Sequence, residues 1–277
     1  MSTTTAGVVV RTSLEGSVER LRDALPVIHV GEDPEGVHQA RVATRRLRSD
    51  LRVFAPLLDV AWAVDLRREL RWLGRALGRA RDADVLFARL EGLSRTWSAA
   101  QRAEAAQALE ALWRQDLDAN VDLRAILAGD RAAALVARLD EAAARPPLTP
   151  LAARPAAELM PTLLAAPRAE LHEAAARAIA EPTDAAIHRV RIAAKHLRYA
   201  SEAVAEVLAG ATDLAAAAEA LQELLGEHQD AVVAEAWLRS FGQEALADAQ
   251  RTTATDVRAR WEALLADIEI AERGLAA

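Results

Sequence analysis

The chain has 277 residues, a formal net charge of −7 and no cysteine. This length is enough to bury a large core in one or two domains. The lack of thiols excludes disulfides, thiolate metal sites and cysteine nucleophiles. Strong helix formers (Ala, Leu, Arg and Glu) are abundant and aromatic residues make up only 4% of the chain. We therefore predict an all-α fold.

The first residues and the apolar segments of the chain predict where in the cell the protein lies. The first residues carry no basic leader and too short an apolar run for a signal peptide. No segment approaches the roughly 18 consecutive apolar residues of a membrane span. We expect a cytoplasmic protein with no membrane partner and a flexible N-terminus over residues 1–13.

Apolar residues recur at helical spacing on both sides of a Pro-rich segment at 145–155, which is the clearest break in the chain. The predicted helices before this break cover about 14–25, 34–58, 62–77, 82–93, 98–116 and 130–143. The predicted helices after it cover about 156–179, 185–208, 212–225, 228–240 and 246–275. Two halves of similar length are therefore expected.

A basic segment occurs twice, 150 residues apart: VHQARVATRRLRSDLRVF at 37–54 and IHRVRIAAKHLRYASEAV at 187–204. In a helix, residues three and four apart fall on one face, so the cations of each copy form a stripe opposite an apolar arc. The first stripe contains His38, Arg41, Arg45, Arg48 and Arg52. The second contains His188, Arg191, Lys195 and Arg198, and Glu202 takes the position that corresponds to Arg52.

Positive charge is concentrated in these two segments. Residues 37–52 carry +4 and residues 187–202 carry +3, which leaves −14 for the rest of the chain. Like charges four residues apart destabilise a helix, so a cationic row that occurs twice indicates a binding site rather than a solvated face. Arginine binds phosphate oxygens in bidentate fashion, and histidine gains charge beside an anion. Two facing stripes would suit a chain of phosphates.

A second motif, Leu-Gly-x-x-x-Asp-Ala-x-Val, occurs at 77–85 and at 225–233. We expect Gly78 and Gly226 to end or kink one helix, and Asp82 and Asp230 to cap the next. The alternative is that these aspartates form hydrogen bonds with the stripe arginines.

The two motifs resemble the CHAD family, the conserved histidine α-helical domain, in residues 33–48, 77–85 and 187–199, and the similarity spans about 14–275. The resemblance implies a single domain over 14–277, made of two repeats at about 14–145 and 156–277. It implies two four-helix bundles related by a pseudo-twofold axis, with basic residues around a central cavity or groove. Family members bind inorganic polyphosphate, and several associate with polyphosphate granules.

By position, the implied polyphosphate-binding residues are the nine members of the two stripes: His38, Arg41, Arg45, Arg48, Arg52, His188, Arg191, Lys195 and Arg198. Four further candidates lie on or beside the basic helices or in the segment after the first of them: Arg46, Arg75, Arg79 and Tyr199.

Two other functions stay open. A nucleic-acid-binding module is disfavoured because few aromatic residues are available for base stacking and because the rest of the chain is acidic. A phosphate-transferring or phosphate-hydrolysing enzyme is the third alternative, but no nucleophile–base pair and no paired carboxylates accompany the stripes. We expect no enzyme activity, no cofactor and no metal, and the sequence does not indicate an oligomeric state.

Overall fold

The computed structural model describes residues 4–30 and 34–275. It confirms the all-α prediction, because these residues form α-helices and two short 3-10 helices and contain no β-strand. The first half comprises α1 (Ala6–Val30), α2 (Pro34–Val53), α3 (Val60–Ser94), α4 (Ala99–Leu127) and α5 (Asp130–Ala144). The second half comprises α6 (Ala156–Leu163), α7 (Ala165–Ala180), α8 (Asp184–Val204), α9 (Ala211–Ser240), α10 (Glu244–Arg258) and α11 (Trp261–Gly274).

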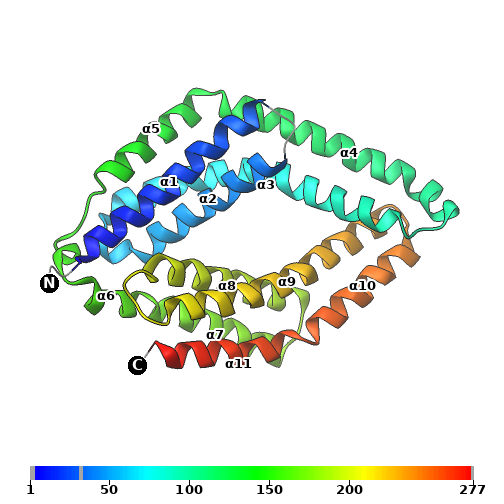
Figure 1. Cartoon of the computed structure of the whole chain (residues 1–277). Helices are drawn as coiled ribbons and strands as arrows, with labels where there is room; N and C mark the ends of the chain where they lie inside the picture. The colour runs from blue at the N-terminus through cyan, green and yellow to red at the C-terminus, as the bar shows by residue number, and fades with distance from the viewer. Residues whose placement is uncertain (1–3, 31–33, 276–277) are drawn as a thin grey trace.

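The two halves lie one above the other, with α2 and α3 on the side that faces α8 and α9 (Figure 1). In the first half α2 packs between α1 and α3, and in the second half α8 packs between α7 and α9. The two basic helices, α2 and α8, also pack against each other. They are therefore the inner helices of their halves and meet at the boundary between them.

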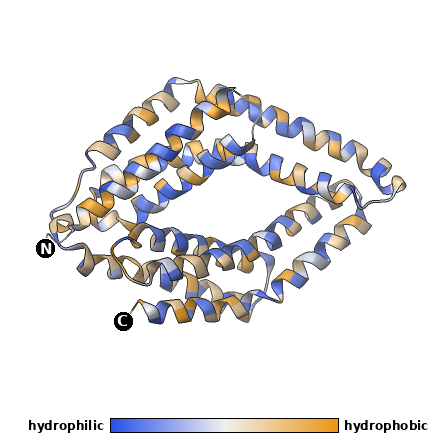
Figure 2. Ribbon diagram, viewed as in Figure 1, coloured by the Kyte–Doolittle hydropathy of each residue, from blue (hydrophilic) through white to orange (hydrophobic). Residues whose placement is uncertain are grey.

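The apolar arc predicted for the first basic helix is confirmed. Ala40, Ala43, Leu47, Leu51 and Phe54 are each no more than 1% exposed. These residues join one continuous core that also includes the buried side of α8. Hydrophilic residues colour much of α2, α3, α8 and α9 where the two halves face each other (Figure 2). Because the apolar side of each basic helix packs into its own half, the opposite side is left to face the other half.

The N-terminus differs from the sequence prediction. Helix α1 begins at Ala6, so residues 6–13, which the sequence assigned to a flexible segment, are helical. Ala6 and Val10 are fully buried. The backbone N–H of Ala6 donates to the carbonyl of Arg154, and the N–H of Ala156 donates to the carbonyl of Thr4. The Pro-rich segment thus holds the start of α1; residues 1–3 lie outside the described residues.

Several predicted helix boundaries also differ. The predicted helices at 62–77 and 82–93 are one continuous helix, α3, and those at 212–225 and 228–240 are one continuous helix, α9. Gly78 and Gly226 therefore do not end a helix, and this part of the prediction is wrong. The predicted helix at 156–179 is divided into α6 and α7. Pro167 lies in the first turn of α7, where its ring prevents an uninterrupted helix through the preceding turn.

None of the helices in the described part of the chain combines the length and the apolarity that crossing a membrane requires.

Candidate anion-binding site

The two cationic stripes approach each other where α2 and α8 pack together. The pKa of Lys195 on α8 is lowered to about 8, first by burial and then by nearby arginines, which are, in order, Arg45, Arg191, Arg41 and Arg48. Three of these four arginines belong to α2. Burial also lowers the pKa of Arg45, and Arg41 and Arg191 contribute to that lowering. The cations of both halves therefore lie close enough to lower one another's pKa values.

Several of these cations have no acidic partner within the described residues. Arg45, Arg48 and Lys195 form no ion pair there. The Nε atoms of Arg45 and Arg191 are buried and have no hydrogen-bond partner among the described residues. Buried donors without acceptors cost free energy, and cations gathered together repel one another. Both costs would be relieved by an anion with several acceptor oxygens.

Tyr199 lies at the centre of this group. Its side chain is 4% exposed, and its proximity to Arg45 raises the pKa of that arginine, against the lowering caused by burial. The guanidinium groups of Arg46 and Arg198 each lie 5.7 Å from the centroid of its ring. Tyr199, which the sequence offered as an additional candidate, therefore orients arginines from both basic helices while it is itself buried.

The glycine motif brings α3 and α9 close to the stripe arginines. A Cβ atom at Gly78 would lie 3.5 Å from Nη1 of Arg41, and one at Gly226 would lie 3.6 Å from Nε of Arg191. A third contact of this kind joins Gly74 and Arg48, with a Cβ-to-Nη1 distance of 3.8 Å. Glycine at these positions lets the guanidinium group lie directly across the neighbouring helix.

The aspartates of the same motif lie near stripe arginines, and one of them, Asp82, binds Arg41. Nη1 of Arg41 donates to the carbonyl oxygen of Gly78 at 3.1 Å and to Oδ1 of Asp82 at 2.6 Å. Burial raises the pKa of Asp230, and the proximity of Arg191 opposes this rise. The prediction that Asp82 and Asp230 cap helices is wrong, because both lie inside continuous helices. The alternative, a hydrogen bond to a stripe arginine, is confirmed for Asp82. For Asp230 the structure shows proximity to Arg191 only.

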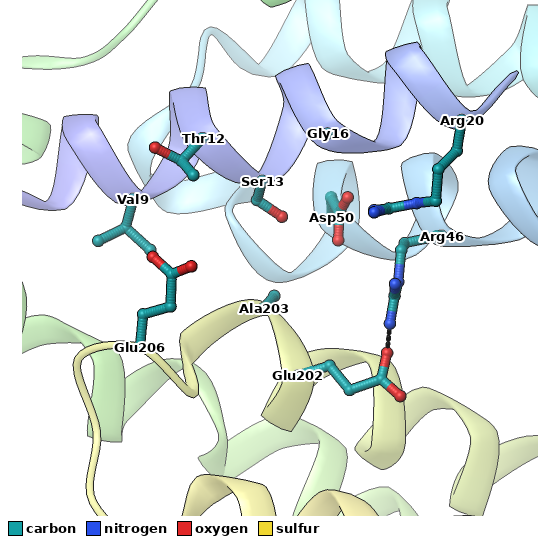
Figure 3. A pocket seen from close by; sticks show the side chains of 10 residues that line it. All are labelled: Val9, Thr12, Ser13, Gly16, Arg20, Arg46, Asp50, Glu202, Ala203 and Glu206. Atoms are coloured by element: carbon teal, nitrogen blue, oxygen red, sulfur yellow. Dashed lines mark ion pairs between the residues drawn. The ribbon is translucent and has the colours of Figure 1, made fainter. Parts of the chain in front are cut away.

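Ion pairs between the halves flank the group of unpaired cations. Arg52 of α2 donates to Oε2 of Glu170 in α7 at 2.7 Å, and its Nη1 lies 2.8 Å from Nδ1 of His196 in α8. On the other flank, Arg46 of α2 pairs with Glu202 of α8 (Figure 3). These contacts join α2 to the second half and give Arg46 and Arg52 acidic partners.

A pocket of about 300 Å³ lies beside the Arg46–Glu202 pair, between α1, α2 and α8 (Figure 3). Asp50 lines it and is 1% exposed, and Ser17 donates a hydrogen bond to Oδ2 of Asp50 at 2.9 Å. Burial raises the pKa of Asp50 to about 7. Arg20 and Glu206 also line the pocket. Because it contains both signs of charge, this pocket lacks the uniformly cationic lining of the α2–α8 crossing.

A row of arginines on α3 adjoins the first stripe: Arg67, Arg71, Arg75 and Arg79, each four residues from the next. Burial lowers the pKa of Arg48, and Arg71, Arg67 and Arg75 lower it further. Arg75 and Arg79 were predicted from the sequence as additional candidates, whereas Arg67 and Arg71 were not, although the spacing of four residues was a signal that could have identified them.

The remaining stripe residues have different surroundings. Arg198 donates from Nε to Glu202 at 2.8 Å and pairs through Nη2 with Glu219 of α9 at 2.7 Å. Burial lowers the pKa of His38, and Arg81 lowers it further, which favours the neutral ring. The Nδ1 atom of His188 is buried without a partner in the described residues.

Within the described residues, no three His, Cys, Asp or Glu side chains are grouped so as to hold a metal ion.

These observations define an all-α protein in which each half contributes one cationic helix to a shared crossing. A family model described as "CHAD domain" matches residues 12–239. The chain belongs to the CHAD domain family, as the resemblance in its motifs implied.

The curated relatives that match include two proteins of Mycobacterium tuberculosis, described as uncharacterized protein MT2285 (strain CDC 1551 / Oshkosh) and uncharacterized protein Rv2226 (strain ATCC 25618 / H37Rv). Each is 33% identical over 227 residues, and the match covers 72% of this chain and 39% of the relative. The matched part is thus well under half of each relative's length.

Two solved structures have the same fold. PptA from Streptomyces chartreusis superposes with a TM-score of 0.74 at 23% identity, covering 98% of this chain and 100% of that one. The CHAD domain from the plant Ricinus communis superposes with a TM-score of 0.70 at 28% identity, covering 100% of this chain and 93% of that one.

Proposed function

We propose that this protein binds inorganic polyphosphate at the crossing of α2 and α8. The observation that carries the proposal is the group of cations around Lys195, which come from both halves and include Arg45 and Arg48, for which the described residues provide no acidic partner. Membership of the CHAD domain family supports the same ligand. The stripe residues are the proposed contacts, and α3 contributes further arginines beside Arg48.

The chemistry of the site favours a chain of phosphates over a single phosphate. Orthophosphate would neutralise two or three cations and leave the others in mutual repulsion. A linear polyanion could bind all of them at once, and each contact would be a charge-assisted hydrogen bond. Binding should then weaken steeply with salt, since every neutralised phosphate releases a counterion.

A nucleic acid is the second candidate and shares the phosphate chemistry. Trp72 of α3 already forms a cation–π contact with Arg131. The guanidinium carbon of Arg131 lies 4.3 Å from the centroid of the Trp72 ring. Tyr199 at the crossing is buried and offers no free ring face for a base. Because a single-stranded nucleic acid binds largely through stacking, this arrangement favours a ligand without bases.

We propose a binding role rather than catalysis. The stripe residues supply hydrogen-bond donors and positive charge to a bound anion. Proton transfer needs a group within reach of the reacting atom, and two of the acids beside the stripes, Asp82 and Glu202, are engaged by arginines. Incubation with polyphosphate and Mg²⁺, followed by measurement of released phosphate and of phosphohistidine, tests this part of the proposal.

The principal experiment compares ligands and variants by calorimetry at moderate salt. Long-chain polyphosphate should bind far more tightly than orthophosphate, and should displace single- and double-stranded oligonucleotides. The double variant Arg45→Ala/Lys195→Ala should lose roughly 100-fold in affinity, since each charge-assisted contact corresponds to about ten-fold. Equal affinity for orthophosphate and polyphosphate would overturn the proposal.

A matched control removes the same net charge elsewhere. Arg11 and Arg260 are exposed, and neither forms an ion pair within the described part of the chain. The variant Arg11→Ala/Arg260→Ala should keep its affinity within about two-fold, because distant exposed charges are screened at moderate salt.

We also propose that binding places the protein on polyphosphate granules, as the family resemblance suggests. A fluorescent fusion of the full chain should co-localise with granules in cells, and the Arg45→Ala/Lys195→Ala fusion should be diffuse. Granule association that survives this double substitution would separate localisation from the site at the crossing.

A further inference from the structure

The two halves differ in charge beside their basic helices. The Leu-Gly motifs at 77–85 and 225–233 are offset by 148 residues, and this offset relates Arg71, Arg75 and Arg79 of α3 to Glu219, Glu223 and Glu227 of α9. Three arginines in the first half thus correspond to three glutamates in the second. Arg67, the first member of the row, corresponds to Ala215.

The surroundings of the corresponding stripe arginines follow this difference. In the first half, Nη1 of Arg48 lies against α3, 3.8 Å from the position of a Cβ atom at Gly74. Burial lowers the pKa of Arg48, and Arg71, Arg67 and Arg75 of the same helix lower it further. None of the four arginines in the α3 row forms an ion pair or a side-chain hydrogen bond to an acid within the described residues. The first half therefore presents a continuous cationic surface from α2 to α3.

In the second half, Arg198 occupies the position that corresponds to Arg48. Its guanidinium group is bound on two sides by carboxylates, Glu202 at 2.8 Å and Glu219 at 2.7 Å. Its side chain is only 22% exposed, so its donors are largely used inside the protein. A phosphate that approached Arg198 would have to compete with both carboxylates.

We propose that the polyanion site is one-sided: from the α2–α8 crossing it continues over Arg48 of α2 and then along α3 over Arg67, Arg71 and Arg75, and it ends at the acidic row of α9. This inference rests on the proposed function. Arg67 and Arg71 become binding residues that the motif comparison did not assign. Arg198 is excepted from the stripe contacts proposed above, because its ion pairs hold it inside the second half.

The geometry of α3 suits an extended chain. Successive members of the row are four residues apart, so they lie about 6 Å from one another along the helix axis. The row from Arg67 to Arg79 therefore spans about 18 Å. A short polyphosphate bound at the crossing would not reach its far end, whereas a long chain would lie over several of its arginines. The row should contribute to affinity only above a certain ligand length.

The test measures the affinity of tripolyphosphate and of long-chain polyphosphate for the full chain and for Arg67→Ala/Arg71→Ala, each over a range of salt concentrations. We expect the double variant to lose roughly ten-fold or more for the long chain, and the magnitude of its salt-dependence slope to fall by about two, one for each lost phosphate contact. Its loss of affinity for tripolyphosphate should be clearly smaller than its loss for the long chain, because a short chain at the crossing reaches Arg71 beside Arg48 but does not also lie over Arg67. Arg11→Ala/Arg260→Ala serves as the charge-matched control.

A second variant tests the acidic boundary. Glu219→Gln/Glu223→Gln removes two negative charges from α9 and frees one side of Arg198. It should bind the long chain several-fold more tightly than the unmodified protein and show a steeper salt dependence. Unchanged circular dichroism and melting temperature would establish that both double variants are folded.

The outcomes separate this inference from the proposed function. If the unmodified protein binds neither polyphosphate, the proposed function fails and the inference fails with it. If it binds the long chain but Arg67→Ala/Arg71→Ala binds equally well, the inference is overturned and the proposed function stands. Equal losses for tripolyphosphate and the long chain would also overturn it, because the row would then belong to the crossing itself.

Discussion

Replacing Lys195 with methionine should stabilise the ligand-free protein and at the same time weaken polyphosphate binding. In the folded protein, burial and four arginines lower the pKa of Lys195 from 10.5 to about 8. At pH 7 the charged lysine therefore opposes folding, and the difference between the two pKa values corresponds to roughly 3 kcal/mol. Methionine has a similar length and no charge, so it should recover a part of this free energy.

The stability of the folded protein should also depend on pH. Between pH 8 and 10.5 the unfolded chain retains a proton on Lys195 that the folded protein has lost, so the stability of the unmodified protein should rise with pH over this window. The Lys195→Met variant should lack this rise. Urea denaturation in buffers free of phosphate and sulfate measures both effects, since bound anions would stabilise the unmodified protein.

Two results would refute the reasoning about Lys195. One is a Lys195→Met variant that is less stable than the unmodified protein at pH 7. The other is an identical rise in stability between pH 8 and 10.5 in both proteins. Either result would mean that Lys195 is well solvated or already paired with an acid, and that the cations of the two halves do not share one site. Lys195→Arg, which keeps the charge, serves as the control for the binding measurement.

Two further predictions concern the surroundings of the crossing. Because burial raises the pKa of Asp50 from 3.8 to about 7, the folded protein holds a proton between those pH values that the unfolded chain has lost, and its stability should fall as pH rises through this window. Asp50→Asn should remove that fall and should be more stable than the unmodified protein by a few kcal/mol at pH 8. Urea denaturation at pH 5 and pH 8 measures the difference. An equal change in stability between the two pH values in both proteins would contradict this prediction. Gly226→Ala should stabilise the protein by about 0.5–1 kcal/mol, because a Cβ at 3.6 Å from Arg191 is an ordinary contact and alanine favours the helix. Gly226→Leu should instead displace the guanidinium group of Arg191 and lower the polyphosphate affinity measured by calorimetry several-fold. An unchanged affinity in the leucine variant would show that the close approach of Gly226 and Arg191 has no role in binding.

The sequence was sufficient for the fold class and for the inner position of the basic helices. The alternation of an apolar arc with a cationic stripe is a local property of one helix, so it could be recognised without tertiary information. The burial of Leu47 and Leu51 and the convergence of Arg45 with Lys195 follow the pattern that the two stripes indicated.

The glycine motif was harder to interpret from the sequence. A glycine followed by an aspartate four residues later is compatible with a helix end and a new cap, or with a continuous helix that passes close to a neighbour. Local sequence cannot distinguish these cases, because the deciding contact joins Gly78 to Arg41, which lies 37 residues earlier in the chain. The same limit applies to the pairs between the halves, such as Arg46 with Glu202.

The spacing in the sequence was enough to identify the arginine row of α3, but its role in binding could not be inferred from the sequence. Four arginines at intervals of four residues are visible in the sequence, yet only the packing of α3 on α2 places Arg71 beside Arg48. The asymmetry between the halves likewise needed the structure, because Glu219 becomes significant only when Arg198 is found bound to it.

The most direct test of the account is an experimental structure of the protein with long-chain polyphosphate bound. We expect phosphate oxygens within hydrogen-bond distance of Arg45 from the first half and of Lys195 from the second half, with the polyphosphate chain continuing toward Arg71 on α3. Phosphate density confined to the outer surface of one half, with the α2–α8 crossing unoccupied, would contradict it.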